Sequence, residues 1–198
     1  FDELIRRIDV ALEESIDRIM TCHPDHIILG ISAESIWGGS LASAKKIDDR
    51  IKTRAKKNIG VTQAAYALPE ALKVLGIKKN IAILTPYQPV AEGHLRRYAE
   101  ELGYNVVRMK HLCCDSPVTI GHVSEDTLRA SVQEIDSPDV ECIVQFGANL
   151  PMAYVAAEAE RWLRKPVLGI NTTTYWHALR SNGIQDQVRG LGRLMEEF

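Results

Sequence analysis

The sequence is poor in aromatic residues, which make up 6% of its 198 residues, and it contains only four cysteines. In an apolar chain of this length, so few cysteines do not indicate the disulfide framework of a small secreted domain. We therefore expect Cys22, Cys113, Cys114 and Cys142 to be reduced thiols. No apolar run approaches the roughly 20 residues of a membrane helix, and no signal peptide is visible. These absences predict a cytoplasmic protein with no membrane partner.

Neither sign of charge dominates, because 24 Lys and Arg residues stand against 26 Asp and Glu residues, a net charge of −2. Without a basic excess, we expect no nucleic-acid partner. Glycine motifs that bind dinucleotides or phosphates are also missing, and the adjacent Cys113 and Cys114 lack metal-ligand spacing. The sequence therefore gives no reason to expect a nucleotide cofactor or a metal.

Short apolar runs alternate with amphipathic helical patterns along the chain, and 45% of the residues are apolar. This alternation predicts an α/β fold in which parallel sheets carry helices on both faces. The apolar run 26–31 is expected to be a strand that is covered on both faces. Residues 2–20 predict one helix, Thr62 is a candidate cap for the helix that runs to Leu75, and residues 113–123 predict an irregular loop.

The order of these elements contains a weak internal repeat. HIILGISAES and CIVQFGANLP both run from an apolar strand through glycine and small residues into a helix. NIAILTPYQP and KPVLGINTTTYW both run from a strand through a hydroxyl-rich turn to a tyrosine. Two similar lobes that face one another would bring the carboxyl ends of these strands together. Ligands of open α/β sheets bind in the crevice at such strand ends.

Four strand-end loops could carry the chemistry, because they supply hydroxyls, amides and backbone N–H groups that bind carboxylate or enolate oxygens. The residues alone leave other interpretations open. A glycine at a strand-helix turn can serve backbone geometry, Tyr87 can be a packing residue, Thr172 a helix cap and Glu34 a solvated loop residue. The four loops are Gly30–Ser35, Thr85–Tyr87, Gly147–Asn149 and Asn171–Tyr175.

At these loops the chain resembles the aspartate/glutamate racemase superfamily, and within it maleate cis-trans isomerase and arylmalonate decarboxylase. The pieces that carry the resemblance are ILGISAESIWGG, TPY, QFGANLPM and KPVLGINTTTYWHALRSNGI. The resemblance implies two Rossmann-like lobes related by a pseudo-twofold axis, with the ligand cleft between them, and a homodimer or higher homo-oligomer. The implied division is a first lobe at 1–78, a second lobe at 79–171, and a C-terminal segment at 172–198 that returns to the first lobe. The strand with which the family's first lobe begins is not seen before Phe1.

The same resemblance implies a cofactor-independent enzyme that acts on a small carboxylate or dicarboxylate through an enediolate-type species, by isomerisation or decarboxylation. In such racemases and isomerases two catalytic cysteines face the substrate, whereas the decarboxylase keeps only the second and has glycine at the first. Gly30 falls at the first of these positions and Gly147 at the second, so both thiols are absent here. This departure leaves two alternatives open: a non-catalytic homologue that binds carboxylates, or a lyase or hydrolase of altered mechanism.

The resemblance also suggests individual site residues. Ser32 and Tyr87 match positions that hold a carboxylate or enolate oxygen, and the N–H of Ala148 matches a backbone donor. Ser116 would substitute for a carboxylate-binding asparagine expected at Pro117. The candidate catalytic residues are Tyr87, Ser32 and Glu34, and the candidate substrate-binding residues are Gly30, Ile31, Ser32, Thr85, Tyr87, Ser116, Gly147, Ala148, Asn149 and Thr172.

Overall fold

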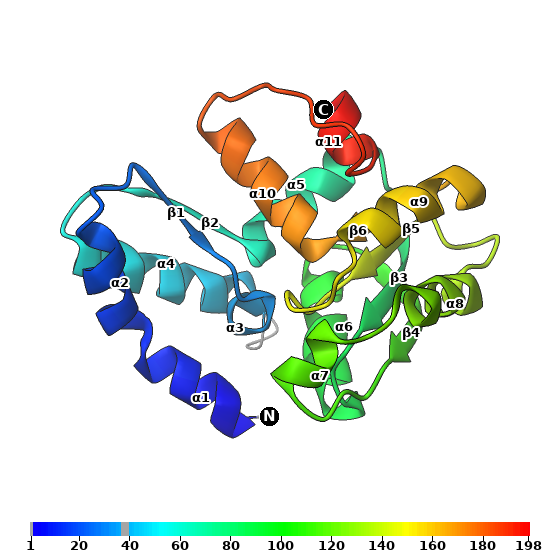
Figure 1. Cartoon of the computed structure of the whole chain (residues 1–198), viewed down its shortest axis with the longest axis horizontal. Helices are drawn as coiled ribbons and strands as arrows, with labels where there is room; N and C mark the ends of the chain where they lie inside the picture. Colours follow the sequence, from blue (N-terminus) through cyan, green and yellow to red (C-terminus); the bar gives the residue numbers. More distant parts are fainter. Residues whose placement is uncertain (1, 37–39) are drawn as a thin grey trace.

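The computed structural model describes residues 2–36 and 40–198; the side chains of Asp2, Leu4 and Glu34 lie outside this description. It contains two parallel sheets in two lobes (Figure 1). The first sheet pairs β1 (His26–Leu29) with β2 (Gly60–Gln63). The second has the strand order β4 (Asn105–His111), β3 (Asn80–Thr85), β5 (Cys142–Gln145), β6 (Val167–Gly169). The predicted α/β fold with parallel sheets is confirmed.

Helices connect and cover these strands. The first lobe contains α1 (Asp2–Val10), α2 (Leu12–Met20), α3 (Ser32–Ile36), α4 (Leu41–Ala55) and α5 (Ala64–Val74). The second lobe contains η1 (Pro89–Ala91), α6 (Glu92–Glu101), α7 (Pro117–Gly121), α8 (Glu125–Ile135) and α9 (Ala153–Leu163). The chain then continues through α10 (Ile170–Ser181) and α11 (Arg193–Glu197). None of the described helices is long and apolar enough to cross a bilayer.

The apolar runs explain the burial of the second sheet but not that of β1. Every residue of β5 is buried, as are the last five residues of β3, which is the pattern of parallel strands covered on both faces. In β1, by contrast, Ile28 is 42% exposed between the buried Ile27 and Leu29. The prediction that this strand is covered on both faces is therefore wrong, because a continuous apolar run does not reveal what packs on each face.

Three local predictions are also wrong. The helix expected over residues 2–20 is two helices separated at Ala11. Thr62 does not cap α5, because it lies in β2 and its hydroxyl bonds two histidine rings. The loop expected at residues 113–123 contains α7, which Ser116 starts by accepting a hydrogen bond from the N–H of Thr119. Proline in the first turn and this capping box stabilise a short helix that an apolar pattern does not reveal.

The larger of two hydrophobic clusters extends across both lobes, and the smaller one lies within the first lobe. Tyr98 on α6 is fully buried, and its hydroxyl donates to the carbonyl oxygen of Ala65 on α5 at 2.7 Å. Its ring also meets that of Phe146 edge-to-face, with centroids 6.3 Å apart. The helix α10 contacts α5, β1 and β2 as well as β6, so it bridges the two sheets (Figure 1). The lobes are thus held together by packing, while the domain boundaries given above stay a prediction.

Where α10 meets β1 and β2, a buried hydroxyl links two imidazoles. Thr62 Oγ1 lies 2.8 Å from His26 Nε2 and 3.1 Å from His177 Nδ1. Gly60 makes room for this contact, since a Cβ there would lie 2.4 Å from His26 Nδ1. Burial lowers the pKa of both imidazoles, and for His177 the carboxylate of Glu70 partly opposes that effect.

This pair predicts a loss of stability on acidification. Because the folded chain holds both histidines below their ordinary pKa of about 6.5, protons bind the unfolded chain more tightly. The stability is fully present above the unfolded value and falls as the pH drops below it. We expect the urea midpoint to decrease between pH 7 and pH 5. The double variant His26→Gln, His177→Gln should show a flatter decrease, and an unchanged slope would contradict the assignment.

Candidate functional site

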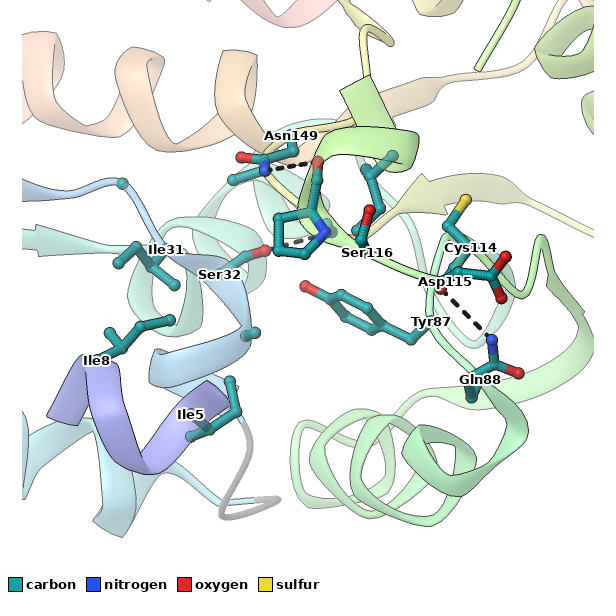
Figure 2. Close-up of a pocket in the computed structure, with 16 residues that line it drawn as sticks. Ile5, Ile8, Ile31, Ser32, Tyr87, Gln88, Cys114, Asp115, Ser116 and Asn149 are labelled. Atoms are coloured by element: carbon teal, nitrogen blue, oxygen red, sulfur yellow. Dashed lines mark hydrogen bonds between the residues drawn. The ribbon is translucent and has the colours of Figure 1, made fainter. Parts of the chain in front are cut away.

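The carboxyl ends of β1, β3 and β5 bring three of the predicted loops together around one cavity of about 630 Å³. This volume falls within the range of small-molecule sites in proteins. Figure 2 shows Ser32 and Tyr87 pointing toward one another across it, with Ile5, Ile8 and Ile31 on one side. The cavity is lined by Ile5, Ile8, Gly30, Ile31, Ser32, Ala33, Tyr87, Gln88, Cys114, Asp115, Ser116, Pro117, Ile120, Gly147, Ala148 and Asn149.

Ser32 joins the two lobes at the wall of this cavity. Its Oγ accepts a hydrogen bond from the N–H of Gly147 at 3.2 Å, and its hydroxyl also hydrogen-bonds the phenol of Tyr87. All three residues are buried. We call Ser32, Tyr87 and Gly147 the polar cluster. It places two hydroxyls from different lobes beside each other, as the binding of an oxyanion requires.

The phenol of Tyr87 is a proton donor at neutral pH. Burial raises the pKa of Tyr87 to about 12, and the hydrogen bond with Ser32 opposes that rise. The hydroxyl therefore keeps its proton and can donate a hydrogen bond to an anionic oxygen. A phenol that stays protonated cannot accept a proton at neutral pH, so the cluster is suited to donate hydrogen bonds to a negatively charged oxygen.

The loop from Gly147 to Asn149 offers backbone donors to the same cavity. Gly147 has a φ of +100°, and a Cβ there would lie 2.4 Å from the Pro86 ring. The side chain of Asn171 holds the loop by donating to the carbonyl of Ala148 at 2.7 Å, and that of Asn149 donates to the carbonyl of Pro117 at 3.1 Å. Within the described chain, the N–H groups of Ala148 and Asn149 donate to no acceptor, so they can bind a ligand oxygen.

The structure places the other predicted site residues in different ways. Ser116 lines the cavity, but its hydroxyl is engaged in capping α7. Thr85 is buried at the end of β3, and its Oγ1 accepts a hydrogen bond from the backbone N–H of Tyr87 at 3.4 Å. Thr172 lies in the first turn of α10, outside the cavity, and does not cap that helix, whose N-cap is Gly169. Glu34 is on α3, and its side chain lies outside the described residues.

Much of the cavity wall was not predicted. Ile5 and Ile8 come from α1, and Ile120 comes from α7; apolar residues at helical spacing are ordinarily interpreted as core. Ala33 lies inside the predicted loop Gly30–Ser35 but was not among the candidate site residues, and Gln88 directly follows Tyr87. The wall that these residues add is mainly apolar. The described residues contain no group of three or more His, Cys, Asp or Glu side chains that could hold a metal ion.

Cys114 is the cysteine that lines the cavity, and Cys113 beside it is exposed. Burial raises the pKa of Cys114, and the neighbouring carboxylate of Asp115 raises it further. Its sulfur also points away from the Tyr87 hydroxyl (Figure 2). Since the thiolate is the nucleophile, both features disfavour Cys114 as a replacement for a catalytic cysteine.

The chain is similar in sequence to known proteins. The family model for arylmalonate decarboxylase matches residues 6–195. A maleate isomerase of Alcaligenes faecalis is 25% identical over 150 residues, which is 74% of this chain and 59% of that protein. One from Nocardia farcinica is 28% identical over 139 residues, or 69% of this chain and 55% of that protein. The chain therefore spans less than two thirds of the curated relatives that it matches.

Solved structures show the same fold. The Nocardia farcinica maleate cis-trans isomerase bound to TRIS superposes with a TM-score of 0.93 at 21% identity, covering 100% of this chain and 81% of that one. An arylmalonate decarboxylase superposes with a TM-score of 0.84 at 20% identity, covering 96% of this chain and 85% of that one. At these identities the likeness establishes the two-lobed architecture, and the chemistry must be argued from the cavity.

Proposed function

This chain belongs to the arylmalonate decarboxylase family, and we propose on that premise that it decarboxylates a small malonate-type acid with an apolar substituent. The polar cluster carries the proposal, because it is an oxyanion-binding arrangement that contains a proton donor. The apolar wall of Ile5, Ile8 and Ile31 lines the same cavity on the side of Ser32, opposite Tyr87, and suits an aryl or alkyl group.

Decarboxylation requires fewer groups than the other reactions of such sites. Loss of CO₂ leaves the bonding electrons of the broken C–C bond on the remaining carboxylate as an enediolate, which Ser32 and the N–H groups of Ala148 and Asn149 can stabilise. The Tyr87 hydroxyl then gives its proton to the α-carbon and regains one from water. No thiol is needed. Isomerisation through a covalent adduct needs a nucleophile, and neither Gly30 nor Gly147 can supply one.

The double glycine also favours a second candidate function, a homologue that binds carboxylates without turnover. One experiment separates the two. The protein is incubated with phenylmalonate in deuterated water, and the acid is followed by proton NMR while calorimetry records binding. We expect loss of CO₂ with one deuterium at the α-carbon and no conversion of maleate. Binding without turnover would favour the second function; no binding by any of a panel of mono- and dicarboxylates would exclude both.

Asp115 gives a prediction about substrate charge. It is exposed, and among the described residues that line the cavity it alone carries a formal charge. An exposed carboxylate repels a dianion by roughly 1 kcal/mol at contact distance in water. Asp115→Asn is therefore expected to tighten phenylmalonate binding about fivefold at low salt, and less at high salt. Phenylacetate, a monoanion, should respond less. Weaker dianion binding in the variant would contradict this role.

A further inference from the structure

A histidine outside the cavity holds the backbone of Tyr87. His111 is the last residue of β4 and lies opposite Thr85 of β3 in the sheet register. Its Nδ1 is 3.3 Å from the carbonyl oxygen of Tyr87. A carbonyl oxygen can only accept a hydrogen bond, so Nδ1 carries the proton and donates. This contact joins the end of β4 to the residue whose phenol faces the cavity.

The opposite edge of the same ring faces a carboxylate. His111 Nε2 is buried and lies 3.6 Å from Oε2 of Glu92, the first residue of α6. The other carboxylate oxygen of Glu92 accepts a hydrogen bond from Arg96 Nε at 2.6 Å. A carboxylate beside one ring nitrogen fixes which way the imidazole faces and which nitrogen bonds the other partner. Both ring nitrogens of His111 therefore face oxygen acceptors, and both can donate only in the doubly protonated ring. In that form the carboxylate of Glu92 holds the Nε2 edge, and the Nδ1–H faces the Tyr87 carbonyl.

The two neighbours of Tyr87 are fastened to the segment that follows His111. The N–H of Cys114 donates to the carbonyl of Pro86 at 2.9 Å. The side-chain amide of Gln88 donates a hydrogen bond to the carbonyl oxygen of Cys114 at 3.4 Å (Figure 2). The His111 contact lies between these two, at the residue that carries the phenol. A catalytic side chain must be held within about 0.5 Å of its productive position by such supporting contacts.

We propose that His111, oriented by Glu92, is a positioning residue that sets the place of the Tyr87 hydroxyl beside Ser32. The inference rests on the proposed function in one respect, the role of Tyr87 as proton donor. It predicts that loss of the His111 donor lets the phenol leave its buried position, even though His111 itself never touches the substrate.

The test uses the intact chain and three variants. His111→Leu removes the donor, and His111→Asn keeps an N–H near the place of Nδ1. The third, Glu92→Gln, removes the charge that orients the ring and serves as the milder variant if the leucine variant does not fold. His23→Asn is the matched control, because His23 is exposed and its positive φ of 50° suits asparagine. Two quantities are measured: the titration of the Tyr87 phenol by NMR of ¹³Cζ-labelled tyrosine, assigned with Tyr87→Phe, and the turnover of phenylmalonate.

In the intact chain the phenol should titrate near pH 12. In His111→Leu we expect its titration to move toward that of a solvated tyrosine, with turnover reduced roughly tenfold and KM changed less, as for a lost hydrogen bond. His111→Asn should restore most of the Tyr87 titration and most of the turnover. Glu92→Gln should shift the titration and the turnover in the direction of the leucine variant. An unchanged titration in both His111→Leu and Glu92→Gln would overturn the proposal. The titration needs no substrate, so it tests His111 even if the chain turns over no acid.

Discussion

Replacing Tyr87 with phenylalanine is expected to reduce the turnover of phenylmalonate by roughly 10²–10⁴-fold, the usual contribution of a positioned acid. In the proposed reaction the substitution removes the proton that the enediolate carbon receives, and it leaves the ring in place near Gly147. Binding should weaken less than turnover, because Ser32 and the N–H groups of Ala148 and Asn149 still hold the carboxylate. Steady-state kinetics and calorimetry on the same preparation measure the two effects separately.

A second tyrosine gives the matched control. Tyr154 on α9 is 73% exposed, so Tyr154→Phe removes a hydroxyl from the same kind of side chain without touching the cavity. It should turn over substrate at the rate of the unsubstituted chain. If Tyr87→Phe kept its turnover within a factor of two, the proton would have to come from another group, and the polar cluster would be a binding feature only.

The two strand-end glycines are expected to respond very differently to the same substitution. Gly147→Ala should destabilise the chain by about 2–5 kcal/mol, because it forces a side chain into the left-handed region and against the buried ring of Pro86. At Gly30 nothing lies within 4 Å of an added Cβ. Gly30→Ala should therefore change the free energy of unfolding by less than about 1 kcal/mol. Denaturant unfolding of both variants provides the comparison.

A double variant separates the two causes at Gly147. Combining Pro86→Ala with Gly147→Ala removes the steric part of the penalty and leaves the part that comes from the positive φ. The double variant should therefore be more stable than the sum of the single effects predicts. An equal loss of unfolding free energy in Gly30→Ala and Gly147→Ala would show that the Pro86 ring does not exclude a side chain at residue 147. The geometry would then no longer explain why a side chain, including a thiol, is absent there.

The alternating apolar runs were sufficient to predict the fold class, because parallel strands that are buried on both faces, such as β3 and β5, are continuous apolar runs in the sequence. They could not predict Ile28, since exposure of a strand face depends on what packs there. They also missed α7, whose start depends on the local capping of Ser116 and Thr119. Hydrogen bonds between side chains and backbone decide such details, and hydrophobic periodicity does not report them.

For the site, strand-end position was the informative signal. It indicated Ser32, Tyr87 and Gly147 before any geometry was known, and these three meet at the cavity. It could not distinguish Gly30 from Gly147, because only the backbone angle and the Pro86 ring make them different. Nor could it find His111, which acts through the carbonyl of Tyr87 and carries no motif of its own.

The place where a carboxylate binds can be measured directly. Phenylmalonate is titrated into ¹⁵N-labelled protein while the amide signals of Gly147, Ala148 and Asn149 are followed, with the distant Gly76 and Gly183 as internal references. We expect the first three signals to shift together and to saturate with the calorimetric binding curve, while the two reference signals stay in place. Saturable binding that leaves Gly147, Ala148 and Asn149 unshifted would contradict a carboxylate site at the polar cluster.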